Sequence, residues 1–173
     1  MTDATIKADG DRAAIRLERV LADKPSEVWK ALTEPDELVR WFPCKIVVDG
    51  DVWRVGAKLE FPFPLDVMDV TLTGEVLVVD APHALVYTWG DETLRFELHD
   101  HEGGTRLVLV DVLERPRAAR NAAGWDDCLD RLQQVAVEAG AWRKRFTRYA
   151  SIFEPDFGAQ DGPPEGYKGD KGV

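Results

Sequence analysis

Alternating apolar and polar residues fill most of the first part of the chain. Ile15 and Leu17 alternate with Arg16 and Glu18, a period of two that predicts a strand. The same period returns in a series of later segments, at 45–48, 58–63, 69–80, 85–89, 94–98 and 105–112. Glycine-containing turns separate the last of these segments, so consecutive strands are expected to pair as an antiparallel sheet.

Helical spacing replaces this alternation at two places. After the first strand, Pro25 and Pro35 each suit the first turn of a short helix. After the last strand, apolar residues recur at intervals of three and four, which predicts one long amphipathic helix from Arg117 to about Ala139. Gly140 interrupts this stripe, and a shorter terminal helix is expected after it.

This order of elements predicts an α+β fold. A sheet and an amphipathic helix each have an apolar face to bury, so the long helix is expected to pack against the sheet. The sheet would have about six to seven strands, with two short helices after the first strand. A twisted sheet wrapped round a helix encloses space, and Gly56 and Gly74 fit places where such a sheet bends.

Length and composition favour one domain. The chain has 173 residues, of which 45% are hydrophobic and 31% are charged, as in ordinary globular proteins. We expect a single domain over residues 13–153, preceded by a flexible N-terminus over residues 1–12. Residues 154–173 are rich in Gly, Pro and charge. They are expected to form a mobile tail, or one held to the surface by Phe157, Tyr167 and Val173.

Charge and hydropathy narrow the range of partners. The net charge of −10 repels phosphate groups, so nucleic acid and anionic membrane surfaces are poor partners. No apolar run approaches the ~20 residues that span a bilayer, and the polar N-terminus does not resemble a signal peptide. Cys44 and Cys128 form no paired motif, as expected for reduced thiols. We therefore expect a cytoplasmic protein that does not insert into membranes.

Four segments carry recognisable motifs: IRLERVLADKPSEVWKALTEPDELVRWF (15–42), TGEVLVVDAPHALVYTW (73–89), GGTRLVL (103–109) and GWDDCLDRL (124–132). In this order they resemble the family named after the activator of heat-shock protein 90 ATPase. The resemblance covers about residues 13–137. Each motif alone is weak, whereas all of them in order and at compatible spacing are fairly specific for the family.

The resemblance implies the helix-grip fold of the wider START-like and polyketide cyclase superfamily. In that fold a curved antiparallel sheet wraps round a long C-terminal helix, and the cavity between them holds hydrophobic ligands. The eukaryotic co-chaperone has a separate chaperone-binding domain ahead of this one. Only about twelve residues precede the first predicted strand here, so we expect that domain to be absent.

The expected cavity wall consists of side chains in the inward phase of the sheet and the long helix: Leu59, Phe61, Phe63, Leu72, Tyr87, Trp89, Phe96, Trp125, Leu129 and Leu132. Trp29, Trp41 and Phe42 would close one mouth of the cavity. Ordinary core filling is an equally good interpretation of each residue taken alone, because aromatic residues dominate packed cores. The cavity that the resemblance implies favours ligand binding for the set.

Two charged residues continue apolar phases of the predicted strands. Arg19 follows the phase of Ile15 and Leu17, and Asp111 follows that of Leu107 and neighbouring apolar residues. A charge in such a position is costly to bury without a partner. Near the cavity rim, Arg19 and Asp111 would pair with each other or orient a carboxylate or amine of a ligand. A surface ion pair is the other interpretation.

The sequence gives no support for a metal, a cofactor or a catalytic set. His99 and His101 share one strand face, but no third ligand is identifiable beside them. Asp126 and Asp127 are expected on a solvated helix face. No nucleotide-binding loop or serine hydrolase motif occurs, and Cys128 lies in the apolar stripe of the long helix, where a thiol is usually inert.

The leading hypothesis is therefore a protein that binds an unidentified hydrophobic small molecule in the cavity. Two alternatives stay open. The first is a cyclase or dehydratase type of enzyme that uses the same cavity and one buried acid or base. The second is a chaperone-linked protein-interaction module, supported by the basic residues of the segment Arg143–Arg148. The oligomeric state is open, and a homodimer is compatible with the sequence.

Overall fold

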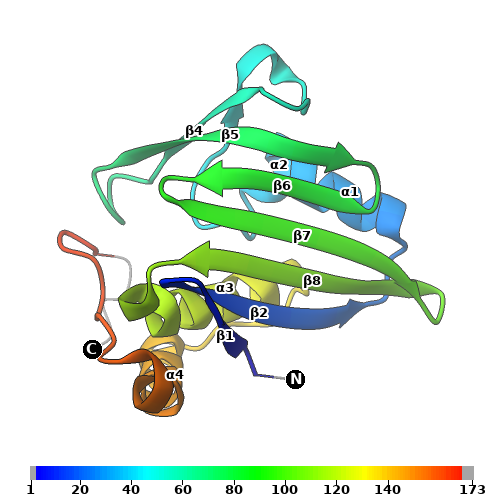
Figure 1. Ribbon diagram of the computed structural model, residues 1–173. Helices are drawn as coiled ribbons and strands as arrows, with labels where there is room; N and C mark the ends of the chain where they lie inside the picture. Colours follow the sequence, from blue (N-terminus) through cyan, green and yellow to red (C-terminus); the bar gives the residue numbers. More distant parts are fainter. Residues whose placement is uncertain (1–2, 169–173) are drawn as a thin grey trace.

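An eight-stranded antiparallel sheet organises the computed structural model, which describes residues 3–168 (Figure 1). The strands are β1 (Thr5–Asp9), β2 (Arg12–Leu21), β3 (Val47–Val48), β4 (Lys58–Pro62), β5 (Thr71–Asp80), β6 (Ala84–Trp89), β7 (Glu92–His101) and β8 (Gly104–Leu113). Their order across the sheet is β1-β2-β8-β7-β6-β5-β4-β3. The α+β class and the antiparallel sheet are confirmed, with a strand count slightly higher than predicted.

The helices lie mainly on one side of this sheet (Figure 1). They are α1 (Pro25–Thr33), α2 (Pro35–Leu38), α3 (Ala118–Leu132) and α4 (Ala141–Phe157), with short 3-10 turns η1 (Asp49–Asp51) and η2 (Arg115–Arg117). Helix α3 contacts β2, and α4 packs on α3. Proline occupies the first turn of both α1 and α2, as the sequence predicts.

Period-two alternation sets which side chains face the helices. In β7, Leu94, Phe96 and Leu98 are buried, whereas Arg95 and His99 are exposed. The partner strand β8 follows the same rule, with Phe96 opposite Leu109 and Leu98 opposite Leu107. One face of the sheet is therefore continuous apolar surface, which α1 and α3 cover.

The N-terminal residues join the sheet instead of lying outside the domain. Thr5–Asp9 pairs with β2, and Asp9 lies opposite Arg12 across a turn at Gly10. Gly10 has a φ of 60°, a conformation that glycine adopts without strain. Strand β1 is mostly exposed, with Thr5 and Lys7 both at the surface, so it lacks the clear apolar–polar alternation that predicts β2. That is why sequence analysis left residues 1–12 outside the domain.

The long helix ends earlier than the sequence predicts, at Leu132 instead of about Ala139. Its last turn closes with two backbone hydrogen bonds, from Val135 N to Asp130 O and from Gln134 N to Arg131 O. Gln134 has a φ of 58°. This is the Schellman arrangement, in which the left-handed residue is usually glycine. Because Gln134 takes that place, the apolar spacing runs past the end of the helix without a visible stop signal.

Helix α4 buries a face of α3 that was expected to be solvated. Asp126, Asp127 and Asp130 are all buried. Arg145 of α4 forms ion pairs with Asp127 and, at 2.5 Å, with Asp130. Tyr149, also from α4, donates its hydroxyl hydrogen bond to Asp126. The three carboxylates therefore serve helix packing, and the expectation of a solvated face for Asp126 and Asp127 is wrong.

The segment after α4 turns back across the molecule. Gln160 Oε1 accepts a hydrogen bond from Ala119 N at 2.9 Å, which caps the start of α3. Lys168 N donates to Val67 O at 2.7 Å, and the Tyr167 ring lies 6.4 Å from that of Trp142, centroid to centroid. Figure 1 shows this segment in red beside the loop that follows β4. We call residues 158–168 the C-terminal strap; Val173 lies outside the described residues.

Candidate functional site

Aromatic rings fill the inner part of the space between the sheet and the helices. Neighbouring rings in the series Trp41, Phe96, Tyr87 and Phe61 have centroids 5.9 to 6.0 Å apart. Phe42, Leu59 and Leu129 are also buried in this core. These residues, expected to form the wall or close the mouth of a cavity, thus pack against one another. Trp29 is half-buried and packs against the same core.

A cavity of about 440 Å³ remains at the other end of this space, between α3, the edge of the sheet and the C-terminal strap. We call it the α3 cavity. Phe63, Leu72, Trp89 and Trp125, all expected in the wall, line it. The sequence did not single out the rest of its apolar lining, which includes Pro43, Met68, Val70, Cys128, Trp142 and Tyr167. Its size is that of ordinary small-molecule sites, about 300–1,000 Å³.

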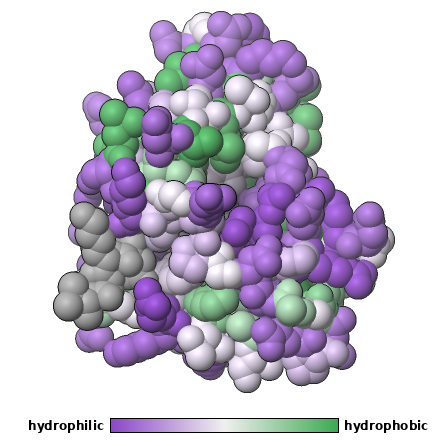
Figure 2. Space-filling model, turned by 90° about the vertical axis from the view of Figure 1, so that its left-hand side faces the viewer, coloured by the Kyte–Doolittle hydropathy of each residue, from purple (hydrophilic) through white to green (hydrophobic). Residues whose placement is uncertain are grey.

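The strap and the loop after β4 border the α3 cavity. Pro164 and Tyr167 of the strap line it, as does Met68 of the loop. Seen from the side that carries these two segments, the surface is mostly hydrophilic, and hydrophobic groups occupy separate small areas (Figure 2).

Polarity changes along the α3 cavity. One face of α3 presents Asn121, Gly124, Trp125 and Cys128, residues three or four apart on a helix. The beginning of α3 and the β6–β7 turn make the polar end, with Arg117, Arg120, Asn121, Asp91 and Glu92. Farther along α3 most of the lining is apolar, with Asp127 and Arg131 as the charged exceptions. A ligand that fits this gradient has an apolar body and a polar group at one end.

A buried carboxyl pair lies at the polar end. Asn121 Nδ2 donates to Glu92 Oε2 at 2.8 Å and to Asp111 Oδ2 at 3.0 Å. Trp125 Nε1 donates to the same Asp111 oxygen at 2.9 Å. Asp111 Oδ1 is buried without a hydrogen-bond partner in the part of the chain that the structure describes.

The electrostatics of this pair favour a shared proton. Burial raises the pKa of Asp111 to about 6. Burial also raises the pKa of Glu92, and the nearby Asp111 carboxylate raises it further. Two desolvated carboxyls next to each other do not both ionise easily. The pair can therefore offer a hydrogen-bond donor as well as acceptors.

Arg19 and Asp111 do not pair with each other. Arg19 Nη2 lies 2.7 Å from Asp126 Oδ1 and 3.8 Å from Asp130 Oδ1, beneath α4. Along the β2–β8 ladder, Arg19 stands opposite Leu107, whereas Asp111 stands opposite Ile15. The alternative of mutual pairing is therefore excluded, and so is that of a surface ion pair, since both residues are buried. Asp111 belongs to the polar end of the cavity through Asn121, and Arg19 belongs to the α3–α4 packing.

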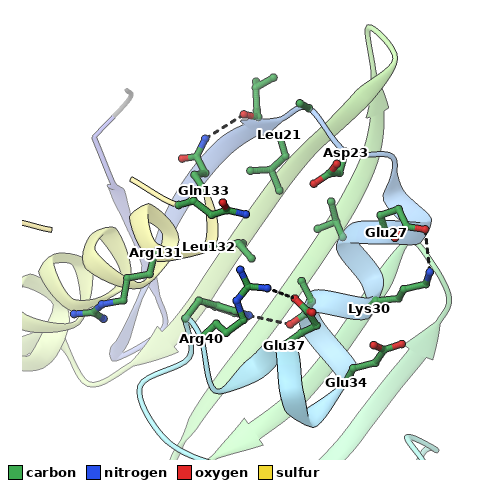
Figure 3. Close-up of a pocket in the computed structure, with 16 residues that line it drawn as sticks. Leu21, Asp23, Glu27, Lys30, Glu34, Glu37, Arg40, Arg131, Leu132 and Gln133 are labelled. Atoms are coloured by element: carbon green, nitrogen blue, oxygen red, sulfur yellow. Dashed lines mark hydrogen bonds and ion pairs between the residues drawn. The ribbon is translucent and has the colours of Figure 1, made fainter. Parts of the chain in front are cut away.

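Leu132, the remaining residue of the expected wall, lies in a different depression, the polar groove of Figure 3. This groove runs between α1 and α2 on one side and the ends of β2 and α3 on the other. Lys30 pairs with Glu27 at 2.9 Å and Arg40 with Glu37 at 3.3 Å along its wall. These exposed pairs show that the groove is solvated surface.

The thiols and imidazoles do not assemble a reactive centre. Burial raises the pKa of Cys44 and Cys128 to about 12, so both stay protonated at neutral pH. His99 Nε2 lies 3.3 Å from Glu97 on the exposed face of the sheet. Within residues 3–168, no group of three or more His, Cys, Asp or Glu side chains is placed to hold a metal ion.

The basic segment Arg143–Arg148 is partly engaged within the chain. Arg145 pairs with aspartates of α3, as described above, and Arg148 pairs with Asp3. None of the helices in the described part of the chain is long and apolar enough to cross a bilayer.

Sequence reasoning missed Glu92, Arg120 and Asn121. For Asn121 the sequence does hold a signal, which is its position: Asn121 and Gly124 share a helix face with Trp125. A polar and a small residue there would have suggested an opening on an otherwise apolar stripe. Glu92 could not be found in this way, because it directly follows a hairpin turn.

Comparisons with known proteins agree with this architecture. The model of the activator of Hsp90 ATPase homolog 1-like family matches residues 23–136. A conserved protein of unknown function from Enterococcus faecalis is 22% identical, with a TM-score of 0.74, over 88% of this chain and 91% of its own. CalU16 from Micromonospora echinospora is 21% identical, with a TM-score of 0.68, over 88% and 95%.

At this level of identity, the similar structures show the fold alone. No curated protein matches the chain. The family match covers more than half of the sequence and includes α1, α2 and α3 together with strands β3 to β8. This chain therefore belongs to the family of activator of Hsp90 ATPase homolog 1-like proteins.

Proposed function

We propose that this protein binds a hydrophobic small molecule in the α3 cavity. The observation that carries the proposal is the apolar opening of about 440 Å³ between α3 and the sheet. Trp89 and Trp125 stand side by side in its wall, with ring centroids 5.4 Å apart. Aromatic rings give a ligand large contact area at little cost in side-chain entropy.

Gly124 provides a direct test, because it lines the cavity from the middle of α3. A Cβ at this position would meet only Trp142 Nε1, at 3.8 Å, which is ordinary contact distance. Gly124→Leu therefore puts a side chain into the opening without a backbone clash. Leucine also favours a helix over glycine by roughly 0.5–1 kcal/mol, so this variant is expected to fold at least as stably as the wild type.

The measurement is fluorescence titration with the neutral probe N-phenyl-1-naphthylamine. We expect the wild type to enhance its fluorescence, and Gly124→Leu to weaken binding at least tenfold, about 1.4 kcal/mol. Leu132→Trp is the matched control: it enlarges a residue of the same helix in the polar groove and should leave the affinity unchanged. Loss of about 1–3 kcal/mol of stability in Gly124→Leu, without probe binding by the wild type, would show a filled core instead.

One observation favours a cyclase or dehydratase type of enzyme as a second candidate. Glu92 lines the cavity, and burial raises its pKa well above its ordinary value, which favours the protonated acid. An acid held there could protonate a leaving hydroxyl of a bound substrate, and the carboxylate so formed could take the proton from the adjacent carbon as the double bond forms and water leaves. Incubation of candidate hydroxyketones with the wild type and with Glu92→Gln, followed by mass spectrometry, tests this. A product lighter by one water that forms with the wild type but not with Glu92→Gln supports the enzyme. Equal recovery of unchanged hydroxyketone from both proteins excludes this activity for those compounds.

A further inference from the structure

We propose that the natural ligand of the α3 cavity is an amphipathic carboxylic acid, whose carboxylate pairs with Arg120. The inference rests on the proposed function and adds the chemical class of the ligand. It starts from the contrast between Arg120 and the other buried or half-buried arginines around α3.

Arg120 lacks the carboxylate partner that its neighbours have. Its Nη1 donates to the carbonyl oxygen of Gly162 at 3.3 Å, and no carboxylate among residues 3–168 lies within 4.0 Å of it. Arg117, one helical turn earlier, pairs with Asp91 at 2.7 Å and with Glu114 at 3.1 Å. Arg120 is nonetheless half-buried and lines the α3 cavity.

A half-buried guanidinium beside an apolar opening is costly without an anion. Burial and the nearby Arg117 charge lower the pKa of Arg120, and Glu92, Asp161 and Asp91 oppose this only from beyond ion-pair distance. The nearby Glu92 compensates it little, since burial and Asp111 favour the uncharged form of that carboxyl. A carboxylate from the ligand would supply the missing charge through the paired N–H groups of the guanidinium.

The rest of the cavity fits the remainder of such a molecule. Phe63, Leu72, Trp89 and Trp125 lie along the apolar part, beyond the polar end where Arg120 enters. An amine ligand would instead meet Arg120 beside Arg117, whose charge Asp91 balances, and the Glu92 carboxyl, which tends to keep its proton. The charges at the polar end therefore favour an acid over an amine.

Isothermal titration calorimetry with three compounds that share one ring system tests the charge preference: 2-naphthylacetate, 2-naphthylethanol and 2-naphthylethylammonium. We expect the acetate to bind the wild type at least tenfold more tightly than the alcohol, and the ammonium compound to bind most weakly. Arg120→Gln should remove the preference for the acetate while the alcohol binds as before. Arg120→Lys should restore part of it.

Arg95→Gln is the control for net charge, since Arg95 is exposed on the opposite face of the sheet. It should keep the full preference for the acetate. Equal binding of all three compounds, or tightest binding of the ammonium compound, would overturn the inference and leave the proposed cavity function in place. Binding of none of them to the wild type would overturn the proposed function itself. A persistent acetate preference in Arg120→Gln would also overturn the assignment of Arg120.

Discussion

At the scale of single residues, the pKa values of two neighbouring carboxyls, Asp91 and Asp111, are shifted in opposite directions. The hydrogen bond from Arg117 lowers the pKa of Asp91, which is exposed beside the β6–β7 turn. Burial raises the pKa of Asp111, one strand away and fully buried. The difference arises because a guanidinium reaches the exposed Asp91, whereas Asp111 is desolvated and the N–H groups of Trp125 and Asn121 offset that burial only in part.

Asp111→Asn is expected to alter how stability depends on pH. A carboxyl whose pKa is raised in the folded state, here to about 6, binds its proton more tightly when folded. Its contribution is therefore most favourable below the unfolded pKa of ~3.9 and is lost as the pH rises toward 6. Urea midpoints measured at pH 4 and pH 7.5 should show that the stability of Asp111→Asn rises relative to that of the wild type as the pH increases.

Asp91→Asn should show the reverse trend and serves as the control. Because its folded pKa is lowered, Asp91 stabilises the fold above the unfolded pKa, and this contribution fades as the pH falls. The variant should lose stability at neutral pH and approach the wild type in acid. A difference between Asp111→Asn and the wild type that does not vary with pH would contradict the raised pKa of Asp111.

Removal of the Arg19 charge is expected to destabilise the fold strongly. Arg19 and Asp126 are both buried, and their closest atoms are 2.7 Å apart. Loss of one member of a buried pair costs about 3–5 kcal/mol, because the other charge stays buried and uncompensated. Arg19→Met should show this loss in urea denaturation, and Arg19→Met/Asp126→Asn should recover part of it. A single-variant effect below about 1 kcal/mol would mean that water or Arg145 compensates the carboxylates.

At the scale of elements, the boundary between α3 and α4 depends on one backbone conformation. Gln134 has a φ of 58° there, which a residue with a Cβ adopts at a cost of about 1 kcal/mol. The left-handed turn lets the chain leave α3 and return as α4, whose Arg145 and Tyr149 then cover the aspartates of α3. A continuous helix through Ala139 could not place them there.

Gln134→Gly should therefore stabilise the protein, by about 0.5–1 kcal/mol, because glycine relieves the strain at the left-handed position. Gln133→Gly, one residue earlier, is the matched control. Gln133 has an ordinary φ of −80° and its Nε2 donates to Val20 O at 3.3 Å, so glycine there adds an entropic cost, removes this hydrogen bond and should destabilise. Thermal unfolding of both variants checks this. The same sign for both would show that the helix end is not held in the described conformation.

The elements that sequence analysis found are those with a strong local signal. Strict alternation identified β4 to β8, and the helical stripe identified α3. The family resemblance and the helix-grip architecture are confirmed. The end of α3 was missed because a glutamine takes the place of a glycine.

The site was harder to predict because packing decides it. Phe61 and Phe63 share one strand face, yet Phe61 is buried in the core whereas Phe63 lines the cavity. Which aromatic rings stack and which border an opening depends on neighbours far along the chain. The same holds for Arg120, whose lack of a carboxylate partner is visible only once the elements surround it.

At the scale of the whole molecule, the C-terminal strap connects parts that are distant in sequence. It leaves α4, caps the start of α3 through Gln160 and reaches the loop after β4 through Lys168. Pro164 and Tyr167 thereby become part of the cavity lining. We infer that the strap contributes more to ligand retention than to folding, because none of residues 158–168 belongs to the buried apolar core.

A chain that ends after Gly158 should fold, with a melting midpoint lower by only about 2–8 °C, as expected for a loss of 1–2 kcal/mol. Stopped-flow measurements should show N-phenyl-1-naphthylamine leaving this variant several times faster than the full chain. A chain that ends after Lys168 keeps the strap and should release the probe at the wild-type rate. Unchanged release from the shorter chain would assign retention to the sheet and α3.

The order of the strands has a consequence for how copies of this protein behave toward one another. A sheet grows by adding a strand to a long, regular, unpaired border, which serves as a template for another chain. Here the two borders are β1, five residues that include Lys7 and Asp9, and β3, which is two residues long. Short or charged borders are poor templates. Self-association of the chain is therefore expected to use side-chain surfaces, and continuous intermolecular sheets are not expected from the folded state even in concentrated solution.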